Sequence, residues 1–118
     1  MKILVQKFGG TSVSTPERRK QVVEKIIKAK EDGYEVVVVV SAMGRKGEPY
    51  ATDTLLSLVK DKFILQNALA VDLLMSCGEI ISSVILCNEL NQNNIKCIPL
   101  TGGQAGIITD ENYGNALY

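Results

Sequence analysis

The sequence predicts an α/β fold: a three-layer α/β/α sandwich in which helices flank a mainly parallel sheet. Strand-like apolar runs occupy residues 2–6, 36–40 and 95–100, and helical segments with one apolar face separate them. A strand, a helix and a second strand within residues 2–40 form a βαβ unit, for which the right-handed crossover is strongly preferred. Since the sheet and the helices must bury apolar faces against each other, we expect the three strands to be parallel neighbours covered by helices.

Length and composition are those of one ordinary globular domain. The chain has 118 residues, of which 46% are hydrophobic and 22% charged. Thirteen basic residues balance thirteen acidic ones, so no net charge attracts nucleic acid or an anionic membrane. Aromatic residues make up only 5%, without Trp, which disfavours stacking on bases. We therefore expect no nucleic-acid and no membrane partner.

Cysteine usage and the N-terminus indicate a cytoplasmic protein. Cys77, Cys87 and Cys97 form no C-x-x-C pair, and there is no His, so no metal-binding pattern is present. Three scattered thiols are typical of inert core residues in a reducing compartment. The apolar run at the N-terminus is too short for a signal peptide, and no run approaches the length of a membrane span.

The first strand leads into a loop of unusual composition. After the apolar residues 3–5, the stretch Lys7 to Ser14 reads KFGGTSVS, a glycine- and hydroxyl-rich loop. A helix follows, capped either by Ser14 with Glu17 or by Thr15 with a proline in the first turn. Gly33 is expected just beyond the end of that helix.

The second strand is a run of five valines, residues 36–40. An uninterrupted apolar run of this kind predicts a strand buried on both faces. Residues 41–50 contain two glycines and a proline and are expected to be irregular. A helix resumes at Thr52 or Asp53, either of which can cap it.

Two further helical stretches are expected at residues 67–76 and 79–91, with Gly78 as a break between them. Asn93 and Asn94 predict a turn. Residues 95–100 then form the third expected strand, and TGGQAG follows directly.

Each predicted strand therefore runs into a loop of small or hydroxyl residues, at residues 7–14, 41–47 and 101–106. Ligands of open parallel sheets bind outside the carboxyl ends of the strands. Because these ends meet at one edge of the sheet, we expect the three loops to converge there on a binding site.

The first loop has the features of an anion site. Gly9 and Gly10 let backbone N–H groups approach a ligand, the following helix directs its positive end at the loop, and Lys7 adds a charge. The pattern is neither G-x-x-x-x-G-K-[ST] nor G-x-G-x-x-G. From these residues alone, phosphate binding and a tight turn with an exposed lysine both remain open.

Three further residues are candidates with ordinary alternatives. Ser41 ends the second strand and Thr52 opens a helix, so each hydroxyl either faces a ligand or caps a turn. Glu79 follows the glycine between two apolar helical stretches and is either a ligand-facing carboxylate or a surface residue.

The segments KFGGTSV, VVVVVSAMG, ATDTLL, LLMSCGE and TGGQAGI, in this order, resemble the N-terminal part of an aspartokinase. The resemblance extends over residues 1–118. Within it, residues 41–56 look most like the diaminopimelate-sensitive aspartokinases of Gram-positive bacteria. The resemblance implies the amino-acid kinase fold, which is carbamate kinase-like.

The resemblance also implies a reaction. Aspartokinases transfer the γ-phosphoryl group of ATP to the β-carboxylate of L-aspartate, giving 4-phospho-L-aspartate, the first step towards lysine, threonine and methionine. Mg²⁺ is held mainly through the ATP phosphates, so no protein metal site is implied. The implied ATP contacts are Lys7, which is also catalytic, with Phe8, Gly9, Gly10 and Ser41, and the implied aspartate contacts are Thr52 and Glu79.

Members of the family continue well past residue 118, through a nucleotide lobe and ACT regulatory domains. We therefore expect residues 1–118 to be the N-terminal part of a catalytic domain, truncated, inactive alone and self-associating as a dimer or higher oligomer. Another amino-acid kinase, or a fragment that only binds an anion, remains the alternative.

Overall fold

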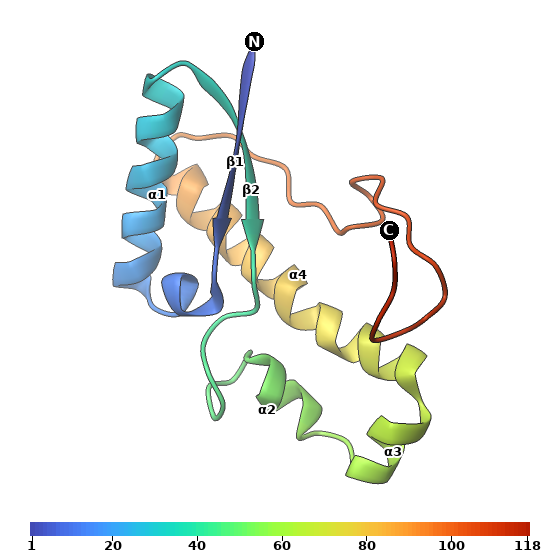
Figure 1. Cartoon of the computed structure of the whole chain (residues 1–118). Helices are drawn as coiled ribbons and strands as arrows, with labels where there is room; N and C mark the ends of the chain where they lie inside the picture. Colours follow the sequence, from blue (N-terminus) through green and yellow to red (C-terminus); the bar gives the residue numbers. More distant parts are fainter.

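The computed structural model describes all residues, Met1–Tyr118. Two strands, a 3-10 turn and four helices follow one another along the chain, and an irregular segment completes it (Figure 1). In chain order the elements are β1 (Lys2–Phe8), η1 (Gly10–Val13), α1 (Pro16–Glu31), β2 (Tyr34–Val40), α2 (Thr52–Leu56), α3 (Asp61–Gln66) and α4 (Ala68–Gln92).

Strands β1 and β2 pair in parallel, and α1 connects them. The register runs from Lys2 opposite Tyr34 to Phe8 opposite Val40. Figure 1 shows α1 beside both strands, antiparallel to them. The βαβ unit and the mixed α/β class expected from the sequence are confirmed.

The residues at the two ends of helix α1 explain where the helix begins and where it ends. Thr15 is the N-cap, and its hydroxyl accepts a hydrogen bond from the N–H of Arg18 at 3.2 Å. Pro16 occupies the first helical position, where its missing N–H costs nothing. Gly33 follows the helix with φ +92°, a conformation that glycine adopts without a Cβ penalty. Of the two caps left open by the sequence, the structure selects Thr15.

The core lies between one face of the sheet and the helices α1 and α4. Each aliphatic side chain buried there stabilises the fold by about 1.5–3 kcal/mol. Its seven buried members are Val13, Val22, Val23, Ile26, Met43, Leu86 and Leu90. The core thus joins the βαβ unit to the long helix α4 and to the segment that follows β2.

The other face of the sheet is uncovered. Val37 and Val39 are 49% and 44% exposed, and Ile3 and Val5 beside them are 60% and 61% exposed. The expectation that the valine run is buried on both faces is therefore wrong for this chain, because within residues 1–118 the helices pack on one face only. Successive side chains of a strand point to opposite faces of the sheet. Because residues 36–40 are all valine, the sequence does not reveal this alternation, but the alternating exposure of the side chains along β2 does.

Residues 95–100 are not a strand of the sheet. The sheet has two strands, and the third expected one is wrong in this structure. The chain reverses at Asn94, whose φ is +61°, and then runs back along α4 without joining β2 (Figure 1). Apolar character alone did not make these residues a strand, because a strand forms a ladder only where a neighbour offers its backbone edge.

Helix α4 is continuous over 25 residues, so the predicted break at Gly78 is wrong. Its best 18-residue window has a mean hydropathy of 1.9, so by length and composition alone it could cross a membrane, contrary to the sequence expectation. One side of α4 nevertheless packs into the protein through residues that include Gly78, Ser82, Leu86 and Leu90. A core helix of a soluble protein passes the same test.

The cysteines are not inert core residues. Cys87 on α4 and Cys97 in the returning segment form a disulfide, with their Cα atoms 6.1 Å apart. Cys77 is a free, exposed thiol. The spacing of ten residues brings the pair together because the chain turns at Asn93 and Asn94 and retraces α4.

Candidate functional site

The carboxyl ends of β1 and β2 meet at one edge, and the segments that follow them are bonded to each other. The N–H of Ser41 donates to the carbonyl of Phe8 at 3.2 Å. Beyond the strands, the N–H of Gly44 donates to the carbonyl of Gly10 at 3.1 Å. The expected convergence of the first two loops is therefore present.

The two adjacent glycines have different roles. A Cβ atom at Gly10 would collide with the carbonyl oxygen of Ala42, so glycine is required there by packing against the second loop. A Cβ atom at Gly9 would meet nothing within 4 Å. The open surface that a ligand needs is therefore at Gly9, and Gly10 holds the loops together.

Lys7 and Phe8 point to opposite faces of β1. Lys7 is exposed and lies opposite Val39 on the uncovered face, where it forms no ion pair. Phe8 packs against the core. At the carboxyl end of β1, Phe8 therefore presents only its backbone, because its side chain is in the core. Lys7 presents a free cationic side chain on the uncovered face near that end.

The hydroxyls of Ser41 and Thr52 make no hydrogen bond within the chain. Ser41 directly follows β2, and Thr52 is the first residue of α2. The N-cap of α2 is Ala51, whose side chain has no atom that can accept a hydrogen bond, so the expected capping by Thr52 or Asp53 is wrong. Both hydroxyls are therefore free to meet a ligand.

Glu79 is positioned by its neighbour Gly78. A Cβ at Gly78 would lie 2.8 Å from the Cβ of Ala42 and 3.2 Å from the carbonyl oxygen of Tyr50. The bare backbone lets α4 approach the second loop this closely. Glu79 itself is exposed at the next position of the helix.

Ala42 is thus the point where three site elements meet. It contacts Gly10 of the first loop and Gly78 of α4, and it directly follows Ser41. The carbonyl oxygen of Tyr50, two residues before Thr52, also lies close to Gly78 of α4. The structure therefore brings the surroundings of Gly10, Ser41, Thr52 and Glu79 together around one small side chain.

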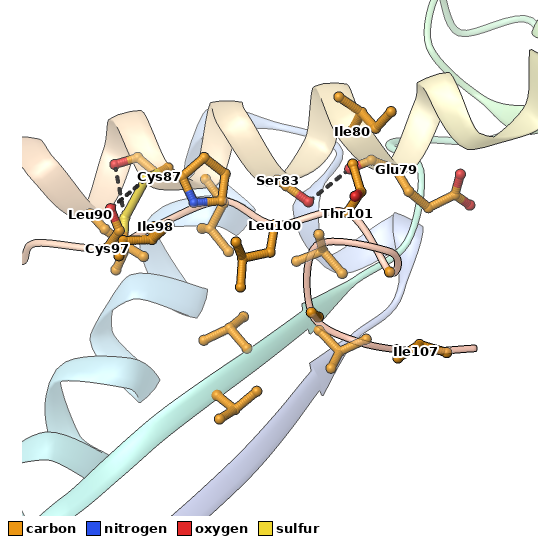
Figure 2. A pocket seen from close by; sticks show the side chains of 18 of the residues that line it. Glu79, Ile80, Ser83, Cys87, Leu90, Cys97, Ile98, Leu100, Thr101 and Ile107 are labelled. Atoms are coloured by element: carbon orange, nitrogen blue, oxygen red, sulfur yellow. Dashed lines mark hydrogen bonds between the residues drawn. A yellow bond between two sulfur atoms is a disulfide. The ribbon is translucent and has the colours of Figure 1, made fainter.

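A groove of about 810 Å³ opens beside these elements. It is lined by β2, by α4 and by residues 96–107, which include the third glycine-rich loop. Figure 2 shows Glu79 on α4 near Thr101, with Ser83 one turn further along the helix. Lys7 does not line this groove, so the structure does not bring Lys7 and Glu79 into one cavity.

Arg19 was not identified from the sequence. Its Nε lies 2.6 Å from Glu89 Oε1 on α4, and its Nη1 donates to the carbonyl of Val13 at 2.9 Å. The same Nη1 lies 3.7 Å from the sulfur of Met43. One guanidinium therefore fixes the end of η1 against α4 and the second loop. A partner 70 residues away leaves no local signal in the sequence.

Comparison with known proteins gives the chain a family. The model of the "Amino acid kinase family" matches residues 2–117. The chain is 53% identical over 116 residues to "Aspartokinase 1" of Bacillus subtilis, a match covering 98% of this chain and 29% of that protein. It is 44% identical over 116 residues to "Aspartokinase" of Geobacillus stearothermophilus, covering 98% of this chain and 27% of the relative.

A solved structure, "Crystal Structure of Aspartate Kinase from Synechocystis", matches with a TM-score of 0.72 and 40% identity. That match covers 86% of this chain and 17% of the solved one. The chain spans less than a third of the length of these curated relatives. The family model matches residues 2–117, and the structure has the joined glycine-rich loops at the edge of a parallel sheet. The chain therefore belongs to the amino acid kinase family.

Proposed function

We propose that this chain is the N-terminal part of an aspartokinase catalytic domain. The whole enzyme would transfer the γ-phosphoryl group of ATP to the β-carboxylate of L-aspartate. The observation that carries the proposal is the 53% identity to Aspartokinase 1 over 98% of the chain. The bonded loops after β1 and β2 supply the edge at which such a reaction can take place.

The proposed nucleotide contacts are Lys7, the backbone of Phe8, Gly9 and Gly10, and Ser41. Phosphoryl transfer asks the protein mainly to position two anions and to stabilise the charge that develops between them. Lys7 supports this role because its ammonium group is exposed and unpaired. Gly9 supports it because its surface is open.

The proposed aspartate contacts are Thr52 and Glu79. The Thr52 hydroxyl has no partner within the chain, and the Glu79 carboxylate is exposed beside the groove. A carboxylate suits the α-ammonium group of an amino acid through a charge-assisted hydrogen bond. Together they would hold the acceptor while Lys7 and the loop amides hold the donor.

Mg²⁺ fits this arrangement as an ion carried by the nucleotide. No group of three His, Cys, Asp or Glu side chains is placed to hold a metal. When bound with the nucleotide, Mg²⁺ would neutralise part of the charge of the phosphates. The site would lie in the cytoplasm, where ATP and free aspartate are both available.

A chimera tests the proposal. Residues of this chain replace the 116 that they match in Aspartokinase 1 of Bacillus subtilis, and ADP release is measured with L-aspartate as acceptor. We expect aspartate-dependent turnover close to that of the unmodified relative. Glutamate, acetylglutamate, carbamate and UMP serve as comparison acceptors, and preference for any of them would replace the proposal by another amino-acid kinase activity.

A further inference from the structure

The carbonyl group of Val13 ends the glycine-rich turn η1 and is buried. Val13 has 0% of its surface exposed, so water does not reach its carbonyl oxygen. No backbone N–H donates to this oxygen. Its hydrogen bond comes from Nη1 of Arg19, at 2.9 Å. Because a buried carbonyl without a donor is costly, the conformation of the turn depends on this one side chain.

Arg19 also reaches the second loop. The same Nη1 lies 3.7 Å from the sulfur of Met43, a buried residue directly before Gly44. Gly44 in turn donates its N–H to the carbonyl of Gly10, the first residue of η1. Arg19 is therefore linked to both ends of the turn, directly at Val13 and through the second loop at Gly10.

The guanidinium is held in place from α4. Its Nε lies 2.6 Å from Oε1 of Glu89, and both side chains are mostly buried. Leu86 and Leu90, on the same part of α4, belong to the core, so Glu89 stands on a fixed stretch of helix. The planar fork of a guanidinium lets one side chain bond this carboxylate and a carbonyl at once.

We propose that Arg19 is a positioning residue for ATP binding. Through the carbonyl of Val13 it sets the direction of the backbone N–H groups at Gly9 and Gly10. This inference rests on the proposed function, in which those amides hold the ATP phosphates. Arg19 acts without touching the nucleotide, because Glu89 and Val13 occupy its guanidinium within the protein. Without it, the Val13 carbonyl turns towards water and the turn that begins at Gly10 changes shape.

Two conservative substitutions separate this role from a general contribution to stability. Arg19→Lys keeps a positive charge beside Glu89, but an ammonium group lacks the fork that also reaches the Val13 carbonyl. Glu89→Gln keeps an oxygen that accepts from Nε, so Arg19 still donates to Val13. The control is Arg18→Lys, the same change at the preceding, exposed arginine, whose Nη1 lies 3.5 Å from the carbonyl oxygen of Thr11.

Steady-state kinetics of the chimera, with each substrate varied, gives the first readout. In Arg19→Lys we expect KM for ATP to rise at least about fivefold, the factor that corresponds to one net hydrogen bond. KM for aspartate should change by less than about twofold, because Thr52 and Glu79 lie outside this network. Glu89→Gln and Arg18→Lys should leave KM for ATP within about twofold.

Three kinetic results would overturn the inference. The first is a rise of KM for ATP in Glu89→Gln or Arg18→Lys as large as in Arg19→Lys. The second is an equal rise of KM for both substrates in Arg19→Lys, which would give this residue a general structural role. The third is an unchanged KM for ATP in that variant.

Amide hydrogen exchange in the ¹⁵N-labelled 118-residue chain gives a second readout that needs no turnover. The N–H groups of Ser12 and Gly44 donate to the carbonyls of the two adjacent glycines, so they report on both loops. We expect Arg19→Lys to speed their exchange at least about fivefold, while Ile26, buried in the middle of α1, keeps its rate. An equal acceleration at Ile26, or none at Ser12 and Gly44, would contradict the positioning role.

The two readouts keep this inference distinct from the proposed function. If the unmodified chimera shows no aspartate-dependent turnover, the proposed function fails, and the exchange rates still decide whether Arg19 positions the loops. If turnover is present and KM for ATP does not depend on Arg19, the proposed function stands and the inference fails.

Discussion

The guanidinium of Arg19 binds the carboxylate of Glu89 at 2.6 Å and joins the first turns of α1 to the last turns of α4. Both side chains are mostly buried, with 13% and 20% of their surface exposed. The same guanidinium donates to the carbonyl of Val13, at the end of the glycine-rich turn. The pair therefore connects the conformation of the first loop to the position of α4.

Arg19→Ala should destabilise the chain by about 2 kcal/mol, since it leaves a partly buried carboxylate and a carbonyl without their donor. Urea denaturation followed by circular dichroism measures the change. Lys28→Ala is the control, because Lys28 and Asp32 form an exposed pair in which the Asp32 carboxylate raises the pKa of Lys28. The control should leave the midpoint unchanged, and an equal loss in both variants would contradict the role assigned to Arg19.

Gly78→Ala should destabilise the fold although alanine is the better helix former by about 1 kcal/mol. The added Cβ lies 2.8 Å from that of Ala42, and overpacking of this kind costs about 1–3 kcal/mol. In the double variant with Ala42→Gly, most of the loss should be recovered. A double-mutant cycle measured by urea denaturation gives the coupling free energy between positions 42 and 78. Additive effects would show that the contact between the two Cβ atoms does not cause the loss of stability.

Lys7→Ala in the chimera should lower kcat by about 100- to 1000-fold, or about 2.7–4 kcal/mol, by analogy with the loss of one oxyanion donor. Because Lys7 is exposed and unpaired, the urea midpoint should stay within error. Lys2→Ala, at the other end of the same strand, should leave turnover unchanged. If kcat/KM for ATP is the same in the Lys7 variant, the lysine is not part of the site.

Glu79→Gln in the chimera should raise KM for aspartate more than KM for ATP, because the neutral amide loses its charge pairing with an ammonium group. Steady-state kinetics with each substrate varied separates the two effects. Glu24→Gln, an exposed glutamate on α1, is the control and should change neither constant. An equal loss for both substrates would assign Glu79 to the fold rather than to aspartate.

The 118-residue chain alone should show no aspartate-dependent ADP release and should self-associate. Its apolar face, formed by Ile3, Val5, Val37 and Val39, is 44–61% exposed, and exposed apolar patches favour association. Light scattering over a concentration series should show growing mass, which the double variant Val37→Lys with Val39→Lys should suppress. A monodisperse unmodified monomer, or measurable turnover, would refute the corresponding half of this prediction.

Local patterns predicted what depends on local chemistry. The glycine after α1 and the strand at residues 36–40 follow from properties of a few adjacent residues. For the cap of α1, the sequence left Ser14 and Thr15 open, and the structure selects Thr15. The break expected at Gly78 failed because glycine there serves a tertiary contact with Ala42, which no local pattern records.

The same limit applies to longer-range features. Pairing of residues 95–100 with β2 depends on the path that the chain takes after its turn at Asn94, and burial of the second sheet face depends on which helices pack there. For the site, the loops at residues 7–14 and 41–47 were predicted to meet and do meet. The different roles of Gly9 and Gly10 depend on which residues surround each glycine, so they appear only in the structure. The same holds for the hydrogen bond from Arg19 to the carbonyl of Val13.

Strands β1 and β2 pair with each other and are close together in the sequence, which has a consequence for biosynthesis. Every pair in the ladder, from Lys2 with Tyr34 to Phe8 with Val40, lies within the first 40 residues. Chains emerge from the ribosome N-terminus first, at about 5–20 residues per second. The βαβ unit can therefore begin to close while the rest of the chain is still being translated.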